Sequence, residues 1–452
     1  MDVPTYLQLK RAFMGGFTHA NAKYVGEKLQ NVSSIDFTSS YPSVMVSEKF
    51  PMSRFRPVEV TSIEQFEKLC STHAVIFDAQ FENITPALAQ ENYLSESKCS
   101  ALTAPVINNG RVVSADLLQT TLTEVDYTIM KQSYNWETLS LANVKAAKKD
   151  YLPQPIVESV LKLYQDKTTL KDVEGSEVEY ALSKEMLNSI YGMCVTDPVK
   201  PTTTFDSAGW GIEQPNLEEK IQEHNESKNR FLYYAWGIWT TAYARRNLWT
   251  GIVAVGEDYV YSDTDSLKFL NYEKHIPYIK WFDQQIINKM KATCHHYNLD
   301  PALLNPKTVD GVEKMLGVWD FEGTYPNFKT LGAKRYLVEH RGKLHLTVAG
   351  LSKSNGIEYM LEVCGNDFNK VFDMFDNSLY IPEDKTGKMT HTYIDEQMSY
   401  EIEDYLGNKS YIETLSAVHL ESCEFTLSLS TTFLDFLSNM KSGIIYRGLR
   451  LA

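Results

Sequence analysis

Tyr261-Ser262-Asp263-Thr264-Asp265-Ser266 is the stretch around which this 452-residue chain is organised. Residues 255–261 before it are rich in β-branched and aromatic side chains, and Leu267–Leu270 follow it, so the pattern predicts two strands joined by a tight turn. Asp263 and Asp265 are two positions apart, and near a strand end this spacing places both side chains on one face. Two carboxylates 4 Å apart repel by roughly 4 kcal/mol at an effective dielectric near 20, which favours a bound cation. The turn is therefore either a divalent-metal site or a solvated turn made of ordinary turn residues.

Two further motifs stand upstream of this turn. They are Ser34-Ile35-Asp36-Phe37-Thr38-Ser39-Ser40-Tyr41-Pro42-Ser43 and Lys184-Glu185-Met186-Leu187-Asn188-Ser189-Ile190-Tyr191-Gly192. In this order, the three stretches resemble motifs A, B and C of family B DNA polymerases: D-x-x-S-L-Y-P, K-x-x-x-N-S-x-Y-G and Y-x-D-T-D-S. The resemblance implies an α+β fold shaped like a right hand, with palm, fingers and thumb. Ser40 stands where the family usually has Leu, a departure that changes the packing expected beneath the nucleotide.

The resemblance also implies the catalytic residues. Asp36, Asp263 and Asp265 would be the catalytic carboxylates and the metal ligands, with Asp36 and Asp265 bridging two Mg²⁺ ions, Asp263 assisting, and Mn²⁺ as an alternative metal. One ion would activate the primer 3′-hydroxyl and the other would neutralise the triphosphate. From the residues alone, an Asp at a strand end is equally typical of a cap or a turn.

Nucleotide binding is implied for five residues: Tyr41, Lys167, Lys184, Asn188 and Tyr191. Tyr41 would pack under the sugar and exclude a 2′-hydroxyl, the two lysines would hold the triphosphate, and the other two would line the base pair. Lys184, Asn188 and Tyr191 fall at i, i+4 and i+7, so an amphipathic helix with a polar face explains the same letters.

DNA contacts are implied at two places. Phe13, Gly15 and Gly16 resemble the Y-x-G-G motif that contacts the template strand. Phe13 replaces the Tyr of the motif, so its ring could still stack on the template but could not make the contact of the Tyr hydroxyl. A paired glycine lets backbone approach a ligand closely, although a structural loop uses it too. Lys334 and Tyr336 resemble the K-x-Y motif that holds the primer terminus, and we expect them on one strand face. A basic surface strand is the alternative.

The motifs and the segments between them predict a domain organisation. The 148 positions from Asp36 to Lys184 are too many for a loop and predict a folded insertion. The insertions resemble the terminal-protein regions of the protein-primed phage-type subgroup, and for the second a flexible linker is the alternative. The expected ranges are 1–55 for the first part of the palm, 56–153 for the first insertion, 154–195 for the fingers, 196–230 for the second insertion, 231–344 for the second part of the palm and 345–452 for the thumb.

Local patterns predict individual elements. Alternation at positions 75–81 indicates a half-buried strand, and Thr121 with Glu124 forms a capping box before a helix at 124–133. Residues 154–192 read as two helices, the second ending at Gly192. After motif A, Pro42 suits the first position of a helix that Ser39 or Ser40 caps. Further helices are expected at 231–249, 367–375 and 431–440.

Composition limits the class of protein. The net charge of −14 is unfavourable for a protein that binds nucleic acid, because phosphate groups are bound by Lys and Arg. If this chain binds nucleic acid, we therefore expect its basic side chains to gather along one groove. No run of 18 apolar residues occurs, and Phe231–Ala244 reads as a buried helix. The start of the sequence lacks a secretion signal. Six cysteines without a C-x-x-C pair suit a reducing compartment and no zinc site, and the expected location is the cytoplasm, that of the host if the source is a bacterial virus.

Only 35 residues precede Asp36, so we expect no 3′–5′ exonuclease domain in this chain. Asp172-Val173-Glu174 and Asp320-Phe321-Glu322 carry the D-x-E letters of such a domain, yet both lie within the polymerase region. The sequence leaves open whether the domain was trimmed away, is split into a separate chain or does not exist.

The expected function is template-directed DNA synthesis on a primer 3′-hydroxyl, in phage or viral-type genome replication. Expected partners are primer–template DNA and deoxynucleoside triphosphates, without a membrane; a priming terminal protein and a separate exonuclease chain are further candidates. Two alternatives stay open: a non-catalytic nucleic-acid-binding subunit, against which the three carboxylates together with Lys184 argue, and a metal-dependent nuclease.

Overall fold

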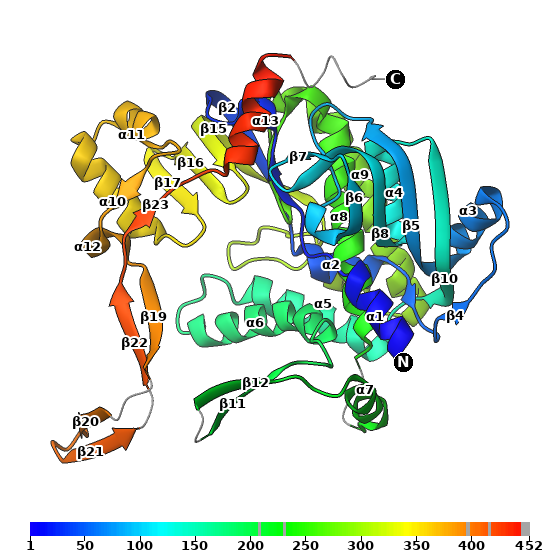
Figure 1. Ribbon diagram of the computed structural model, residues 1–452, viewed down its shortest axis with the longest axis horizontal. Helices are drawn as coiled ribbons and strands as arrows, with labels where there is room; N and C mark the ends of the chain where they lie inside the picture. The colour runs from blue at the N-terminus through cyan, green and yellow to red at the C-terminus, as the bar shows by residue number, and fades with distance from the viewer. Residues whose placement is uncertain (207–208, 229–231, 395–397, 415–416, 444–452) are drawn as a thin grey trace.

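The computed structural model describes residues 1–206, 209–228, 232–394, 398–414 and 417–443. Within these residues, the central sheet is antiparallel and has the strand order β1-β13-β14-β2-β15-β16-β17 (Figure 1). The strands are β1 (Thr18–Ala20), β13 (Tyr259–Asp263), β14 (Ser266–Phe269), β2 (Lys28–Phe37), β15 (Trp319–Gly332), β16 (Arg335–His340) and β17 (Lys343–Val348). β2 pairs with β14 on one side and β15 on the other, so distant parts of the chain meet where β2 ends.

α8 (Tyr234–Val255) packs against β14 of this sheet, α9 (Tyr272–Tyr297) packs against Phe37 and Trp319 through Phe282, and α2 (Ser40–Ser47) lies against both helices. α8 is buried over nearly its whole length, including Trp239 and Trp249, which accounts for its aromatic and apolar sequence. Its neighbour α2 contacts both α8 and α9 and follows β2 directly. Within the described residues, no helix combines the length and the apolar character needed to cross a membrane.

Residues 50–150 form a second antiparallel sheet. Its order is β3-β10-β5-β8-β6, with β4 and β7 pairing at the side and β9 at the end of β5. The strands are β3 (Phe50–Pro51), β4 (Arg56–Pro57), β5 (His73–Pro86), β6 (Cys99–Thr103), β7 (Val106–Asn108), β8 (Arg111–Thr123), β9 (Tyr134–Asn135) and β10 (Thr138–Asp150). With α3 (Ile63–Thr72) and α4 (Glu124–Ser133) this is the folded insertion that the spacing of the motifs predicts.

Below the central sheet in Figure 1 lie two packed helices, α5 (Gln154–Thr169) and α6 (Glu177–Cys194). The hairpin of β11 (Thr202–Asp206) and β12 (Gly209–Glu213) and the helix α7 (Leu217–Glu226) follow them. At the N-terminus, α1 (Val3–Ala12) packs against the second sheet and α8.

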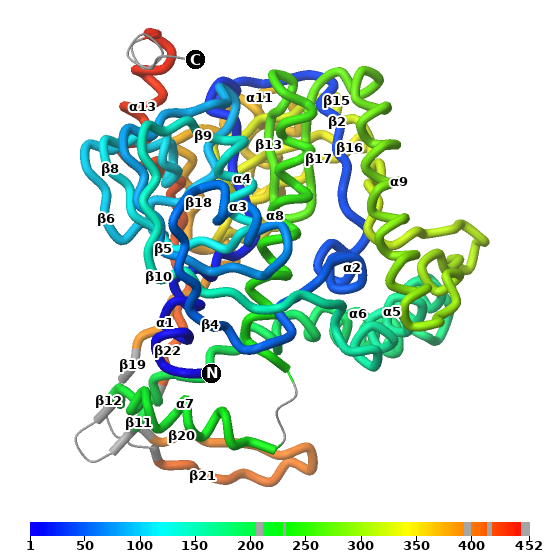
Figure 2. Tube along the Cα trace, turned by 90° about the vertical axis from the view of Figure 1, so that its right-hand side faces the viewer, coloured from blue at the N-terminus to red at the C-terminus, as the bar shows by residue number. Residues whose placement is uncertain are grey.

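The C-terminal part begins with α10 (Lys353–Cys364), α11 (Phe368–Met374) and α12 (Glu383–Thr386) and ends with α13 (Thr431–Lys441). A narrow arm leaves it through β18 (Tyr380–Ile381) with β23 (Phe425–Thr426), β19 (Met389–Ile394) with β22 (Ala417–Ser422), and β20 (Met398–Glu403) with β21 (Lys409–Thr414). Figures 1 and 2 both place the end of this arm at the same end of the molecule as β11, β12 and α7.

Most predicted elements are confirmed, and three local expectations about helix ends were wrong. α4 begins as predicted, but Thr123 caps it, because Thr121 donates its hydroxyl to Asp78 instead. α6 continues through Gly192 to Cys194. α2 begins at Ser40, two residues before Pro42, and Ser39 precedes it in a left-handed conformation without a side-chain cap. Residues 196–230 contain a hairpin and a helix, although the junctions at 207–208 and 229–231 lie outside the described residues.

Candidate active site

The end of β2 brings two of the predicted carboxylates together. Asp36 stands opposite Ser266 on β14, and the backbone N–H of Phe37 donates to the carbonyl oxygen of Asp265 at 2.9 Å. The turn between β13 and β14 is tight: Thr264 has a φ of +58°, and the N–H of Asp265 donates to the carbonyl of Asp263 at 2.6 Å. Motif A and motif C thus meet through the pairing of β2 with β14.

The electrostatics of this corner favour a cation. Burial, then the negative charges of Asp265 and Glu322, raise the pKa of Asp36 to about 8. Burial and the neighbouring Asp263 raise the pKa of Asp265 to about 6. The buried Lys268 on β14 lies among the same carboxylates and lowers both pKa values, but one ammonium does not balance the cluster. A divalent ion would supply the missing positive charge.

Asp263 has protein partners of its own. Thr18 donates its hydroxyl to one carboxylate oxygen at 2.7 Å, and the ammonium of Lys334 lies 3.0 Å and 3.1 Å from the two oxygens. Lys334 sits in the turn between β15 and β16 with a φ of +54°, so the expectation that it shares a strand face with Tyr336 was wrong. The turn nevertheless delivers it to the site, where its N–H donates to the hydroxyl of Tyr261 at 3.0 Å, and the ring of Tyr336 packs on Tyr261 at 5.0 Å.

The donor chemistry fits a hydrated divalent ion. Among the described residues, no three Asp, Glu, His or Cys side chains are grouped closely enough to form a complete protein cage for a metal. Mg²⁺ is commonly held by one or two carboxylates, with water and substrate phosphates as the remaining ligands. Asp36 and Asp265 offer such an incomplete set, and Asp263 stands beside them in contact with Lys334.

A second wall of the site comes from α2, α5 and α6. Lys167 of α5 donates to the hydroxyl of Ser39 at 2.9 Å, and the rings of Tyr41 and Tyr191 lie 4.3 Å apart. Burial, then the neighbouring Lys184, lowers the pKa of Lys167. Lys184 and Asn188 are exposed on α6. The five residues predicted to bind nucleotide therefore lie on α2, α5 and α6, three helices that contact one another.

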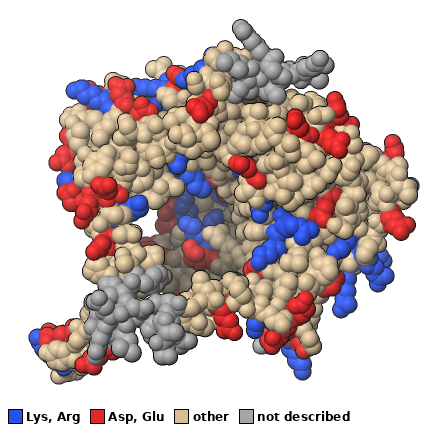
Figure 3. Space-filling view, viewed as in Figure 1, with Lys and Arg blue, Asp and Glu red and all other residues tan. Residues whose placement is uncertain are grey.

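Figure 3 shows where this wall faces the sheet. The middle of the molecule is hollowed between α6 below and β15–β17 above, and Lys and Arg side chains lie on the inner wall of the hollow. The outer surface in the same view carries side chains of both signs. The basic side chains within the hollow agree with the expectation that a protein of net charge −14 gathers cations along a groove.

The paired glycine lies directly against motif C. A Cβ on Gly16 would lie 2.6 Å from Thr264 Oγ1, whereas a Cβ on Gly15 would have open space around it. The N–H of Thr264 also donates to the carbonyl of Phe17 at 2.7 Å. Gly16 is thus required for contact between its loop and the carboxylate turn, while Gly15 leaves room for a ligand. Phe13 ends α1 and is half-buried.

The sequence reasoning missed Arg245, which holds this loop. Buried within α8, its guanidinium donates to the carbonyls of Gly15, at 2.8 Å, and Met14. It also pairs with Asp126 of the insertion at 2.7 Å and donates to the hydroxyl of Tyr93 at 2.8 Å. The sequence shows this arginine directly after the apolar run Phe231–Ala244, and that position was the available signal.

The sequence reasoning also missed Lys268 and Glu322. Glu322 accepts a 2.6 Å hydrogen bond from Ser34. It is part of Asp320-Phe321-Glu322, a stretch that was considered above only as a D-x-E exonuclease motif. Asp320 of the same stretch pairs directly opposite Asp36 across β15 and β2. Strand pairing, which the letters alone do not reveal, places these residues beside the predicted carboxylates.

Over residues 2–279, more than half of its length, the sequence matches the family described as DNA polymerase type B, organellar and viral. The chain belongs to this family. DNA polymerases of Bacillus phage Nf and Bacillus phage phi29 are both 24% identical to this type B polymerase chain, over 344 and 337 residues. These alignments cover 75% and 73% of the chain, which spans about half the length of the relatives it matches.

Solved structures confirm the expected right-hand polymerase fold. The phi29 DNA polymerase complexed with primer–template DNA superposes with a TM-score of 0.61 at 18% identity, over 95% of this chain and 63% of that one. The same polymerase with primer–template DNA and incoming nucleotide substrates gives a TM-score of 0.58 at 17% identity, with the same coverage. At this level of identity, the similarity establishes the fold of this type B polymerase chain.

Proposed function

We propose that this chain is a template-directed DNA polymerase that adds deoxynucleotides to a primer 3′-hydroxyl, in phage or viral-type genome replication. The observation that carries the proposal is the meeting of Asp36 and Asp265 at paired strand ends, with both pKa values raised by burial and by neighbouring carboxylates. Perturbed carboxylates gathered in a cleft are typical of catalytic sites. Family membership gives the reaction, and the relatives are polymerases of Bacillus phages.

Asp36 and Asp265 would hold two Mg²⁺ ions, or Mn²⁺, with Asp263 assisting. Such ions polarise the attacking hydroxyl and neutralise charge on the transferred phosphoryl group. Lys334, paired with Asp263, orients that carboxylate and lies where a primer terminus would approach the two aspartates. Tyr336, packed on Tyr261, supports the same edge.

The nucleotide would bind between α2 and the two helices α5 and α6. Lys167 and Lys184 supply positive charge for a triphosphate, with Lys167 fixed by its bond to Ser39. The rings of Tyr41 and Tyr191, whose centres lie 4.3 Å apart at a tilt of 37°, would form an aromatic floor for the sugar and the base pair, which Asn188 would line. Phosphoryl transfer depends on positioning and charge stabilisation above all, and these groups provide both.

Template DNA would run past Phe13 and the open side of Gly15, while Gly16 keeps its loop on the carboxylate turn. Solved complexes of the phi29 polymerase hold primer–template DNA and incoming nucleotides, which are the partners proposed here. We assign residues 1–55 and 231–344 to the palm, 154–195 to the fingers and 345–452 to the thumb. The insertions at 56–153 and 196–230 would be terminal-protein regions, with a protein primer and a separate exonuclease chain as further partners, and the host cytoplasm as the location.

The test is extension of a labelled primer on a template, comparing the wild type with Asp265→Asn. We expect Mg²⁺-dependent extension by the wild type, loss of extension in the variant, and DNA binding unchanged in both, because the substitution removes a proposed metal ligand and none of the proposed DNA contacts. Extension by the variant at the normal rate would overturn the assignment. Shortening of the primer without nucleotides would instead favour a metal-dependent nuclease, and binding without any reaction would favour a non-catalytic subunit.

A further inference from the structure

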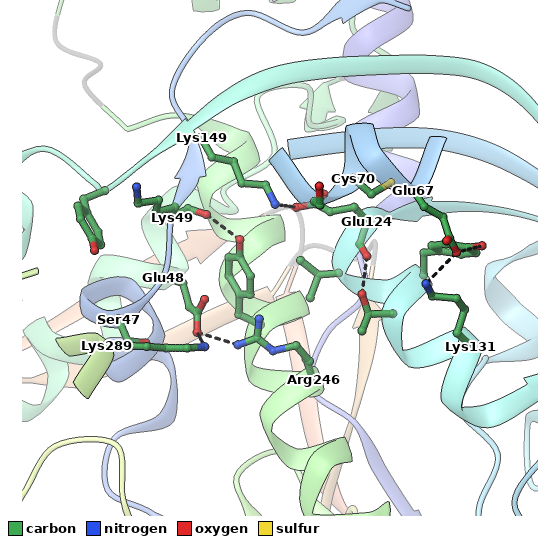
Figure 4. Close-up of a pocket in the computed structure, with 16 residues that line it drawn as sticks. Ser47, Glu48, Lys49, Glu67, Cys70, Glu124, Lys131, Lys149, Arg246 and Lys289 are labelled. Atoms are coloured by element: carbon green, nitrogen blue, oxygen red, sulfur yellow. Dashed lines mark hydrogen bonds and ion pairs between the residues drawn. The ribbon is translucent and has the colours of Figure 1, made fainter. Parts of the chain in front are cut away.

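A second charged pocket lies between the insertion and the palm helices, and no residue of the candidate active site lines it. Its volume is about 480 Å³, within the range of pockets that bind small molecules. One wall, the palm wall, consists of Ser47, Glu48, Lys49, Arg246 and Lys289, from the end of α2 and from α8 and α9. The opposite wall, the insertion wall, comes from α3, α4 and β10. Figure 4 shows both walls facing the same space.

The insertion wall is electrically balanced. Glu124 pairs with Lys149 at 2.7 Å and also accepts hydrogen bonds from the indole of Trp239 and the backbone N–H of Val75. Glu67 pairs with Lys131 at 2.9 Å. Each carboxylate on this wall therefore has one cation, and no charge is left over.

The palm wall has a surplus of positive charge. Glu48 is its single carboxylate and pairs with two cations at once, Arg246 at 2.7 Å and Lys289 at 2.7 Å. Lys49 makes no ion pair with any described carboxylate; its ammonium lies 5.0 Å from the ring centre of Tyr151. Three cations against one carboxylate leave a local charge of +2 on this wall.

The palm wall also carries an unpartnered hydroxyl. Ser47 is 5% exposed, its Oγ is buried, and no described group lies within hydrogen-bonding distance of it. A buried hydroxyl without a partner is costly, and most such groups bind water or a ligand. Ser47 lines the pocket beside the surplus cations, and its hydroxyl has no hydrogen-bond partner among the described residues.

We propose that this pocket binds a phosphate dianion, either inorganic phosphate or the phosphate of a small monoester, against the palm wall. A phosphate dianion offsets the surplus positive charge of the palm wall. Its oxygens accept hydrogen bonds from the ammonium groups and from Ser47, and the electrically balanced insertion wall opposite does not repel it. The site is separate from the proposed reaction. Bound phosphate would tie α2, whose first turn carries Tyr41, to the insertion.

The test measures binding of inorganic phosphate and, separately, of AMP by isothermal titration calorimetry, in EDTA so that metal-dependent binding in the catalytic cleft is suppressed. The wild type should bind one equivalent with a Kd below about 1 mM. Lys49→Gln should weaken binding at least about tenfold, because it removes a charge-assisted contact. Binding of phosphate alone, or of AMP as well, supports the proposal, and the AMP arm shows whether the pocket admits an ester.

Two matched variants decide where phosphate binds. Ser47→Ala should weaken binding about threefold or more while leaving the melting temperature of the phosphate-free protein unchanged or higher, since no protein hydrogen bond is lost. Lys280→Gln, on the exposed face of α9 and outside the pocket, should bind as the wild type does. The proposal is overturned if Lys49→Gln binds phosphate as tightly as the wild type does, or if the wild type binds neither ligand at about ten times the expected Kd.

Discussion

Binding of Mg²⁺ should release about one proton from the carboxylate cluster at pH 7. With pKa values of about 8 for Asp36 and about 6 for Asp265, the metal-free cluster carries about 0.9 and 0.1 proton on these groups at that pH. A divalent ion requires both carboxylates ionised, so the protons leave as the metal binds.

The measurement is titration calorimetry of the metal-free protein with Mg²⁺ at pH 7 in two buffers of different ionisation enthalpy. The difference in binding heat should correspond to about one proton per protein, and at pH 9 it should fall to about 0.1, because the cluster is then already ionised. Asp36→Asn, which cannot carry the proton, should release less than about 0.2 at pH 7. Stoichiometric binding with no buffer dependence at pH 7, or full release by Asp36→Asn, would refute the reasoning.

The same pKa values fix the sign of the pH dependence of stability. Between the ordinary pKa of Asp36, 3.8, and its folded value of about 8, the folded metal-free protein binds more protons than the unfolded chain. The free energy of unfolding should therefore fall as the pH rises through this window. Saturating Mg²⁺ should abolish this trend between pH 6 and pH 8, because neither the metal-bound folded protein nor the unfolded chain then holds a proton on this carboxyl group. Urea unfolding at pH 6 and pH 8, with and without Mg²⁺, measures both effects.

Three further variants test the surrounding structure. Gly16→Ala should slow incorporation about 10- to 100-fold in a single-turnover assay, because its Cβ would lie 2.6 Å from Thr264 Oγ1. Arg245→Met should lower the free energy of unfolding, measured in urea, by about 3–5 kcal/mol, because it leaves the buried carboxylate of Asp126 without its cation. The control Arg11→Met breaks a partly exposed ion pair with Asp78 and should lower it by about 1 kcal/mol or less. Removing residues 202–213, a hairpin that projects beyond the helices α5 and α6 (Figure 1), should reduce strand displacement on duplex templates and spare extension on single-stranded ones.

The sequence predicted those features that depend on local pattern and motif order. The hairpin around Thr264, the helices α4, α5 and α6 and the buried helix α8 all follow from periodicity and turn residues. The resemblance implied that Asp36 and Asp265 hold the same ions, and the pairing of β2 with β14 brings motif A and motif C together.

What the sequence did not predict depends on contacts between distant parts of the chain. Glu322 lies on β15, which pairs with β2 although β15 begins about 280 residues after β2 ends. Arg245 joins the Gly15 loop to Asp126 of the insertion across the core, and no spacing rule links these positions. Lys334 was predicted on a strand face, yet a turn with positive φ delivers it to Asp263.

The most direct test of the account is single-nucleotide incorporation opposite each of the four template bases, by the wild type and by Asp265→Asn, with Mg²⁺ present. The account predicts that the wild type adds only the complementary deoxynucleotide, that addition stops when Mg²⁺ is removed, and that the variant adds none although it still binds the primer–template. Addition that ignores the template base, or that persists in Asp265→Asn, would contradict the assignment of this cleft as the polymerase site.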